Sequence, residues 1–529
     1  MSVRVGGTGA DTFAFQVGAS LSGMVDGGSG SDTLDYQSYG AEVTASLTTS
    51  GGGTATAISG GLANIENFIG SALSDTVSVQ PLAGDARSIR GGDPAGVSPG
   101  DTLNFDAMGQ SLGITDSSMT ATGFGAVNYD TIETLNIGNL SGLVTITGTG
   151  SGDTLTVVPV DGDTTQYQLN TGPTVSLDGL DQLQFDGGDG NDTMIVDFST
   201  GGDLLVNGIR YDGQGQDSVP GDVLRLSGGS TTNSTYTFDD DHSGKIDLAG
   251  AVTGTIHYQG LEPIVDTMNV ADRVFTFTGA DETITLTDAA GTNSTLDSTL
   301  GESVTFANPT ASLTINSASG TDTIRLSSID GAFDADLTVV AGTDDTVDFD
   351  TAVLDIGTGN ANITAGSIDF SAGGISTSGN VTLTANGAGG VSANAAGVDV
   401  VADVLTIDAA AGGIGIGGGN PLRTTVASLD ATTTSTGSIS ILETDAIVLT
   451  DVDTADGSIT VTAGGQITAT DVASLTDADA NDISLTTTAG NLVAGIINAG
   501  AAGDVTLNAA GAIADANGAA NNITADDLV

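Results

Sequence analysis

Hydrophobic and polar residues alternate over short runs in the last third of the chain. Val, Ile or Leu occupies every second position of these runs, and Thr or Ser occupies most positions between them. A period of two is typical of a β-strand with one buried face and one exposed face. The alternation predicts strands at residues 363–368, 381–385, 438–442, 458–463, 482–486 and 504–508.

The spacing of these strands predicts their arrangement. Successive runs cluster at spacings of roughly 20 to 24 residues, with Gly, Asn and Asp between them. Such a spacing corresponds to one coil of a parallel β-helix, in which each strand points its aliphatic residues inward. A longer echo of about 124 residues relates 379–405 to 503–528. The last third is therefore expected to be a stack of coils.

A glycine- and acid-rich turn that leads into a short apolar run organises the earlier part. Its fullest copy covers residues 186–196, and shorter copies cover 6–13 and 27–34. Glycine supplies the positive φ angles and close backbone approach that a tight turn requires. The core of this pattern, Asp-Thr followed by an apolar residue, recurs at Asp75, Asp101, Asp153, Asp266, Asp322 and Asp345.

Two further features concern the order of the chain. Residues 183–201 match 313–331 at a constant offset of 130, which indicates two copies of one all-β unit. Residues 81–99 interrupt the pattern with prolines and with Arg87 and Arg90. Because Pro is confined to the edges and bulges of sheets, we expect this segment to leave the coil.

These patterns predict an all-β chain that forms an elongated parallel β-solenoid (β-helix or β-roll) repeat protein. No stretch has sustained helical periodicity. We expect four regions: a glycine- and Asp-rich β-repeat region (1–140), a first copy of the all-β unit with an insert (141–265), a second copy (266–350) and β-helix repeats (351–529).

The turns resemble the RTX, or haemolysin-type, repeats of secreted bacterial proteins, whose signature is Gly-Gly-x-Gly-x-Asp-x-apolar-x. Residues 61–77 are similar to a sequence that accompanies such repeats in very large bacterial exoproteins. Residues 351–529 resemble, by pattern, the filamentous-haemagglutinin-like repeats of giant bacterial surface exoproteins. The resemblance implies an extracellular or cell-surface protein of which this chain is a segment, and the segment itself has no signal-peptide pattern.

The RTX resemblance also implies bound calcium, which prefers oxygen ligands. The ligand candidates are Asp11, Asp32, Asp189, Asn191 and Asp192. The turns at Gly7 and Gly28 are spaced more widely than the turns of tandem RTX rolls. Single Asp-rich sites are therefore expected here rather than ions shared between successive turns.

Residues 238–247 superficially match the calcium loop of an EF-hand. Asp239 and Asp241 occupy the first and third positions, but Gly250 stands where the bidentate Glu belongs, and no flanking helices are expected. This segment is predicted to be a β-turn or a weak cation site. The two histidines, without any cysteine, do not form a zinc motif.

The charge of the chain excludes several partners. The 66 acidic residues outnumber 9 basic ones, for a formal net charge of −57. Phosphate contacts need Lys and Arg, so nucleic acid is excluded, and an anionic membrane would repel the chain. No run reaches the length of a membrane helix, so no membrane insertion is expected. Cations should stabilise the fold by reducing this repulsion; acidity that serves solubility or a saline habitat is the alternative.

These observations predict a non-enzymatic structural or adhesive segment, stabilised by calcium. Its partners would be cell-surface or extracellular matrix and polysaccharide components, or like chains. A polysaccharide lyase or hydrolase on a β-helix is one alternative, since 66 acids provide many possible carboxylate pairs. A second alternative is an ice-binding solenoid, because Thr-x-Thr pairs such as Thr460 and Thr462 point outward.

Overall fold

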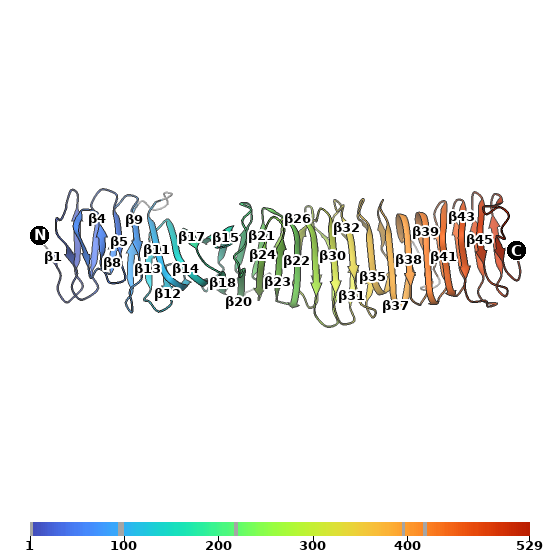
Figure 1. Ribbon diagram of the computed structural model, residues 1–529, viewed down its shortest axis with the longest axis horizontal. Helices are drawn as coiled ribbons and strands as arrows, with labels where there is room; N and C mark the ends of the chain where they lie inside the picture. The colour runs from blue at the N-terminus through green and yellow to red at the C-terminus, as the bar shows by residue number, and fades with distance from the viewer. Residues whose placement is uncertain (1–3, 94–99, 216–220, 394–396, 416–419) are drawn as a thin grey trace. The chain divides into compact units, whose positions relative to one another are not determined.

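A computed structural model describes residues 4–93, 100–215, 221–393, 397–415 and 420–529. All regular secondary structure in these ranges is β-strand, and Figure 1 shows successive strands side by side. The described residues contain no helix that could span a membrane. The predicted fold class, an all-β parallel β-solenoid, is confirmed.

The chain divides into two compact units. One comprises Met1–Thr231 and Lys245–Met268, and the other comprises Thr232–Gly244 and Asn269–Val529. The predicted boundary between residues 265 and 266 lies close to the end of the first unit, whereas those at 140 and 350 fall inside a unit. The chain passes between the units within β22 (Ser230–Asp240) and β23 (Ser243–Ala249).

The remaining strands of the first unit are β1 (Arg4–Val5), β2 (Thr12–Gln16), β3 (Val25–Asp26), β4 (Thr33–Ser38), β5 (Thr44–Leu47), β6 (Gly53–Ala55), β7 (Ile58–Ala63), β8 (Asn67–Ile69), β9 (Thr76–Val79), β10 (Arg87–Arg90), β11 (Thr102–Ile114), β12 (Ser118–Ala121), β13 (Val127–Asp130), β14 (Thr134–Thr147), β15 (Thr154–Asp161), β16 (Thr164–Leu169), β17 (Thr174–Asp178), β18 (Gln182–Asp189), β19 (Thr193–Asp197), β20 (Ile209–Gly215), β21 (Val223–Ser227), β24 (Gly254–Gln259) and β25 (Ile264–Asp266).

Those of the second unit are β26 (Asn269–Phe277), β27 (Thr283–Ala289), β28 (Asn293–Ser298), β29 (Val304–Ala307), β30 (Ser312–Ser317), β31 (Thr323–Leu326), β32 (Asp336–Val340), β33 (Thr346–Asp348), β34 (Val353–Asp355), β35 (Ala361–Phe370), β36 (Gly374–Ser376), β37 (Val381–Ala393), β38 (Val400–Ala409), β39 (Leu422–Thr436), β40 (Ile439–Glu443), β41 (Ile447–Asp456), β42 (Ile459–Ala463), β43 (Ile467–Ser474), β44 (Ile483–Thr487), β45 (Leu492–Asn498), β46 (Val505–Ala509), β47 (Ile513–Asp515) and β48 (Ile523–Thr524).

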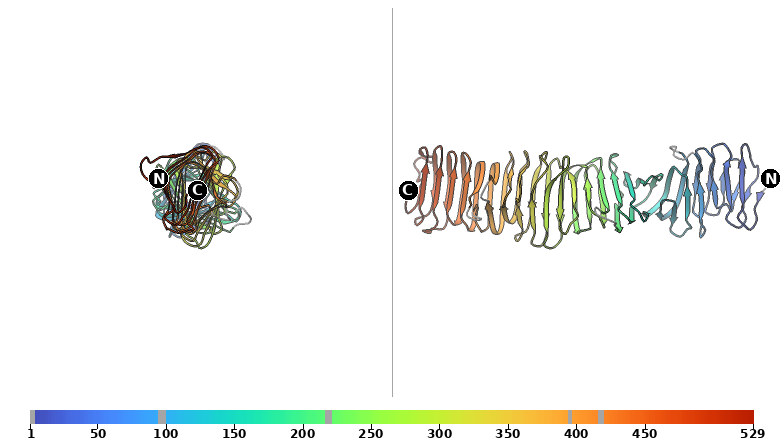
Figure 2. Two further views of the ribbon diagram at one scale, coloured as in Figure 1. Left: turned by 90° about the vertical axis from the view of Figure 1, so that its right-hand side faces the viewer. Right: turned by 180° about the vertical axis from the view of Figure 1, so that it is seen from behind.

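Successive coils stack through parallel strand pairs in register. Along one wall of the second unit, Ile439 pairs with Ile459, Ile459 with Ile483, and Ile483 with Val505. The paired residues are 20, 24 and 22 positions apart, so the predicted coil length is confirmed. The six strands predicted from alternation coincide with β35, β37, β40, β42, β44 and β46. Figure 2 shows the same sequence of strands from behind.

Longer coils carry an antiparallel hairpin. Thr154 pairs in parallel with Thr193, and the chain between them forms the antiparallel strands β15, β16 and β17. Thr283 pairs in parallel with Thr323, and β27, β28 and β29 form the equivalent hairpin. The residues that match at an offset of 130, 183–201 and 313–331, follow these two inserted hairpins directly.

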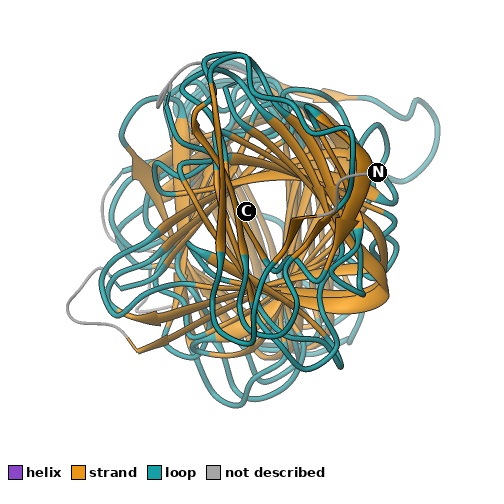
Figure 3. Cartoon of the chain, turned by 90° about the vertical axis from the view of Figure 1, so that its left-hand side faces the viewer, coloured by secondary structure: helices purple, strands orange, loops and turns teal. Residues whose placement is uncertain are grey.

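Inward-facing side chains fill each coil. Residues alternate between buried and half-buried along β18, and paired strands place like residues above one another. Phe185 and Tyr211 are paired in this way, and their rings stack at 5.2 Å. In the second unit, Phe349 and Phe370 stack at 4.6 Å. Figure 3 shows strands forming the walls of the coils, with loops at the corners.

The expectation that residues 81–99 leave the coil is wrong for part of this segment. Strand β10 is a rung of the stack, because it pairs in parallel with β8 and β13. Arg87 is buried there and donates hydrogen bonds to the backbone carbonyls of Ile65, Glu66 and Thr48. Burial lowers the pKa of Arg87 to about 10. Residues 94–99 lie outside the described residues.

Candidate functional site

The aspartates of the glycine-rich turns form a ladder of hydrogen bonds between coils. The backbone N–H of Asp11 donates to Oδ1 of Asp32, one coil further on, at 2.7 Å. The N–H of Asp153 donates to Oδ1 of Asp192 at 2.6 Å, and the N–H of Asp192 donates to Oδ1 of Asp222 at the same distance. Each carboxylate thus binds the amide of the equivalent residue in the preceding coil.

The second carboxylate oxygen can serve the turn to which the aspartate belongs. Oδ2 of Asp11 accepts the N–H of Gly7 at 2.6 Å, and Oδ2 of Asp345 accepts the N–H of Gly342 at 2.6 Å. Oδ2 of Asp153 accepts both the N–H and the hydroxyl of Thr149, at 2.5 and 2.9 Å. Asp345 does both, because its Oδ2 closes its own turn and its Oδ1 accepts the N–H of Asp322 in the preceding coil.

Two glutamates take the place of aspartate in this ladder. Glu66 Oε2 accepts the N–H of Asp32, and Glu133 Oε2 accepts the N–H of Asp101, both at 2.8 Å. Sequence reasoning did not identify either residue. Both belong to an Ile-Glu sequence, Ile65-Glu66 and Ile132-Glu133, which was a usable signal.

Burial raises the pKa of several aspartates of the ladder. Asp101 is 1% exposed, and its burial, with Coulombic repulsion from Asp75 and Glu133 adding to it, raises its pKa to about 6. Burial is also the largest cause of the raised pKa of Asp75, Asp222 and Asp322. Oδ2 of Asp101 is buried without a hydrogen-bond partner among the described residues.

The structure separates the proposed calcium ligands into two groups. Asp32 and Asp192 are fully buried in the ladder, and their Oδ1 atoms already accept amide hydrogen bonds. Asp11 and Asn191 are half-buried, and Asp189 is exposed at the end of β18. Within the described ranges, no group of three or more acidic or histidine side chains is placed to hold a metal ion. A calcium ion at these turns would use outward-facing oxygens, with Asp189 the most accessible.

The EF-hand-like segment is a turn between two strands. Asp239 lies near the end of β22, Asp241 lies in the turn, and both are exposed. His242 Nε2 lies 3.6 Å from a carboxylate oxygen of Asp241. The flanking elements are strands rather than the helices of an EF-hand, and the weak cation site remains a prediction.

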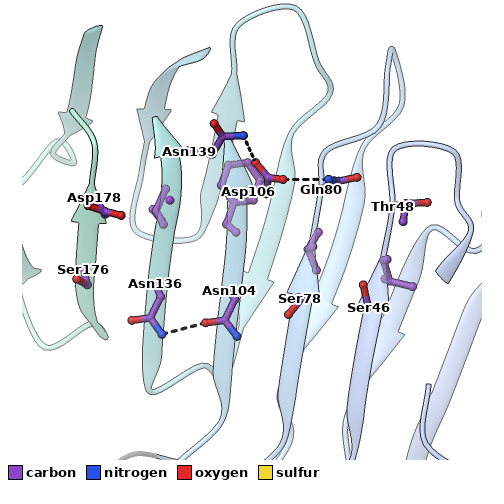
Figure 4. A pocket seen from close by; sticks show the side chains of 15 residues that line it. Ser46, Thr48, Ser78, Gln80, Asn104, Asp106, Asn136, Asn139, Ser176 and Asp178 are labelled. Atoms are coloured by element: carbon purple, nitrogen blue, oxygen red, sulfur yellow. Dashed lines mark hydrogen bonds between the residues drawn. The ribbon is translucent and has the colours of Figure 1, made fainter. Parts of the chain in front are cut away.

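A separate feature of the first unit is a groove of about 580 Å³ on the outer face of β5, β9, β11, β14 and β17. These strands pair in parallel in that order. Their outward residues form a row across the groove, shown in Figure 4, that consists of Ser46, Ser78, Asn104, Asn136 and Ser176. Sequence reasoning did not identify this groove.

Gln80, Asp106 and Asn139 form a second row beside the first, and hydrogen bonds join their side chains. Asp106 accepts from Gln80 Nε2 at 2.9 Å, from Asn139 Nδ2 at 2.8 Å and from the N–H of Met108 at 3.0 Å. Partial burial would raise the pKa of Asp106, but these bonds outweigh it and lower the pKa. Asp106 is therefore held in one position as the acceptor of three hydrogen bonds. Both β11 and β14 bend beside this row, where Met108 and Asn139 have φ of 59° and 55°.

In comparisons with known proteins, no family model matches the chain and no curated protein matches it.

Proposed function

We propose that this chain is a non-enzymatic structural and adhesive segment of a large secreted or cell-surface bacterial protein. The observation that carries the proposal is the use of polar residues within the described coils. Turn aspartates such as Asp153 and Asp192 bind the backbone of their own or an adjacent coil. These carboxylates hold the coils together, and such a use is typical of a repeat protein that binds its partners through its outer surface.

Calcium stabilisation is the second part of the proposal. The turn aspartates contribute to the net charge of −57, and self-repulsion opposes the compact state. A cation that binds only the folded form stabilises it by mass action. Exposed turn oxygens such as those of Asp189 support this proposal, whereas the buried Oδ1 atoms of Asp32 and Asp192 already accept hydrogen bonds from amides.

Surface display tests the adhesive function. A non-adherent bacterium would display the full chain, and its attachment to polysaccharide-coated and protein-coated surfaces would be compared with that of cells displaying an unrelated protein of similar size. We expect a clear gain in attachment. No gain on any surface, or release of sugar fragments from the polysaccharide by the purified chain, would contradict the proposal.

A further inference from the structure

We propose that the groove over β5, β9, β11, β14 and β17 binds an extended, uncharged polysaccharide chain. This inference rests on the adhesive function proposed above and names the chemical class of its target. The groove crosses five strands of the first unit, and all of the residues that line it belong to that unit. The occupant is a glycan because the groove is long and repetitive and combines hydroxyl and amide side chains with apolar surface, as a sugar ring combines hydroxyls with C–H groups.

The repeat of the groove matches the repeat of a sugar polymer. Ser46 pairs with Ser78, Ser78 with Asn104, and Asn104 with Asn136, so one polar side chain occurs at every strand. Neighbouring strands lie about 4.8 Å apart, so five strands span roughly 19 Å. One strand spacing is close to the advance of one ring in an extended β-1,4-linked chain. Because successive rings of such a chain are turned by about 180°, alternate rings can meet equivalent groups on every second strand.

The functional groups of the first row suit sugar hydroxyls. A hydroxyl or an amide both donates and accepts hydrogen bonds, as a sugar hydroxyl does. Asn136 Nδ2 donates to Asn104 Oδ1 at 3.0 Å, which orients the two amides (Figure 4) and leaves further donor and acceptor positions on each. Ser78, on the second strand, is exposed.

Charge selects among polysaccharides. The lining residues include Asp106 and Asp178 and no Lys or Arg, and the chain carries a net charge of −57. Uronate and sulfated polymers would meet repulsion without a compensating cation. An uncharged chain meets no such penalty, so neutral glycans are the expected class.

The groove is expected to bind a single chain with modest affinity. Its one aromatic lining residue, Phe105, is 2% exposed and is not available for stacking on a sugar ring. Hydrogen bonds that replace bonds to water contribute little net free energy each. Many displayed copies would then supply strong attachment through multivalency.

Calorimetry of the purified full chain in calcium-free buffer tests the inference. The probes are cellohexaose, which is neutral, and hexagalacturonate, which has the same number of rings and a charge on each. We expect binding of cellohexaose and at least tenfold weaker binding of hexagalacturonate. Equal binding of the two probes, or no binding of cellohexaose at millimolar concentration, would overturn the proposal.

Two variants locate the site. Ser78→Trp places a large ring in the groove, and the double variant Asn104→Ala/Asn136→Ala removes the amide pair together, so that neither is left unpaired. Each should weaken cellohexaose binding about tenfold or more, which corresponds to one or two hydrogen bonds. Thr460→Trp is the matched control, because Thr460 is also an exposed, outward residue of a parallel wall. Unchanged thermal melting would show that the folds are intact. Wild-type affinity in Ser78→Trp would overturn the assignment to this groove.

The display assay separates this inference from the proposed function. Cells that display Ser78→Trp should lose attachment to neutral polysaccharide. If they attach as well as the wild type, adhesion stands and the groove is not its cause. If neither form attaches but cellohexaose binds the purified chain, the groove assignment stands and the adhesive function falls.

Discussion

The corners of the coils differ between residues 1–350 and residues 351–529. In the first region, buried carboxylates such as those of Asp101 and Asp192 join one coil to the next. In the second region, neutral hydroxyls take over the corners. Thr433 Oγ1 donates to Thr454 Oγ1 at 2.8 Å, and Thr454 Oγ1 donates to the carbonyl of Gly437 at the same distance.

This difference shows that stacking itself does not require charge. Both regions pair their strands in parallel, and both satisfy buried backbone groups at the corners. After residue 350, the fully buried acids among the described residues are Asp399 and Glu443. Burial raises the pKa of acids in both regions, to about 6 for Asp101 in the first and for Asp399 and Asp453 in the second, so both regions should respond to pH. The dependence of stability on ladder carboxylates and on cations should be concentrated in the first region. Four tests address this contrast.

The largest expected loss in the free energy of unfolding follows the removal of one carboxylate of the ladder. Asp75→Ala removes the acceptor for the amides of Val43 and Ser71 and for the hydroxyl of Ser71, all of which are buried. Unpaired buried donors cost about 1–3 kcal/mol each, so we expect a loss of roughly 3 kcal/mol. Thr454→Ala removes neutral bonds and should cost about 1 kcal/mol. Urea unfolding followed by circular dichroism measures both, and equal losses would contradict the contrast.

A smaller loss of stability is expected when a side chain is added at a glycine of a turn. A Cβ at Gly27 would lie 2.0 Å from the carbonyl oxygen of Asn64, whereas a Cβ at Gly9 meets nothing within 4 Å. We expect Gly27→Ala to destabilise by about 2 kcal/mol, since the backbone must shift. Gly9→Ala should be nearly neutral. Similar melting temperatures for the two variants would show that close coil approach is unimportant at this turn.

The pH dependence of stability has a defined sign. The pKa of Asp101 is about 6 in the folded chain, against an ordinary value of 3.8. Between these values the folded state binds a proton that the unfolded state releases, so stability rises as pH falls. The contribution is complete below pH 3.8 and is lost as pH rises through 6. Asp75, Asp222 and Asp322 act in the same direction.

We therefore expect a higher melting temperature at about pH 4.5 than at pH 7. Asp101→Asn keeps an oxygen for the N–H of Asp75 and should reduce this dependence, with its gain largest at pH 7, while Asp399 and Asp453 retain their share of it. Asp101→Ala, which loses that acceptor, should be destabilised at both pH values. A wild-type melting temperature that falls between pH 7 and pH 4.5 would contradict the interpretation.

The smallest expected effect on stability is the stabilisation of the fold by calcium. At a concentration ten times Kd, one site adds about 1.4 kcal/mol, so millimolar calcium should raise the melting temperature by a few degrees. Magnesium should do less. Asp189→Asn should reduce the response, whereas Asp445→Asn, which removes an exposed charge from the second region, should not. Equal responses to both cations, or equal losses in both variants, would indicate screening rather than a site.

The sequence predicted the strands well and the roles of the turn residues poorly. Alternation located β42 and β44 to within a residue, because inward and outward faces impose a period of two. Which two turn aspartates are joined by a hydrogen bond depends on the number of residues in the coil that separates them. That length is short between Asp11 and Asp32 and nearly twice as long between Asp153 and Asp192. Because inserted hairpins change the length of a coil, the spacing of the aspartates in the sequence does not show which of them are partners.

The groove and the buried arginine were missed for a related reason. The row from Ser46 to Ser176 exists only when five strands are aligned, and its members have no common spacing in the sequence. Arg87 belongs to a segment that was expected to leave the coil, and its burial follows from carbonyls supplied by two earlier segments. Residue type alone cannot predict such partners.

The hairpins within the coils also have a consequence for how the chain folds. Leu155 pairs with Leu169, and Ile284 with Ser298, within one hairpin, whereas pairing between coils joins residues that are further apart in the sequence. Short-range hairpins form within microseconds, and longer closures carry a larger entropic cost. The coils that contain hairpins should therefore nucleate first. Among the described residues, the strand pairings from β35 to β48 are parallel, so that stretch should acquire its structure by propagation from a neighbouring coil.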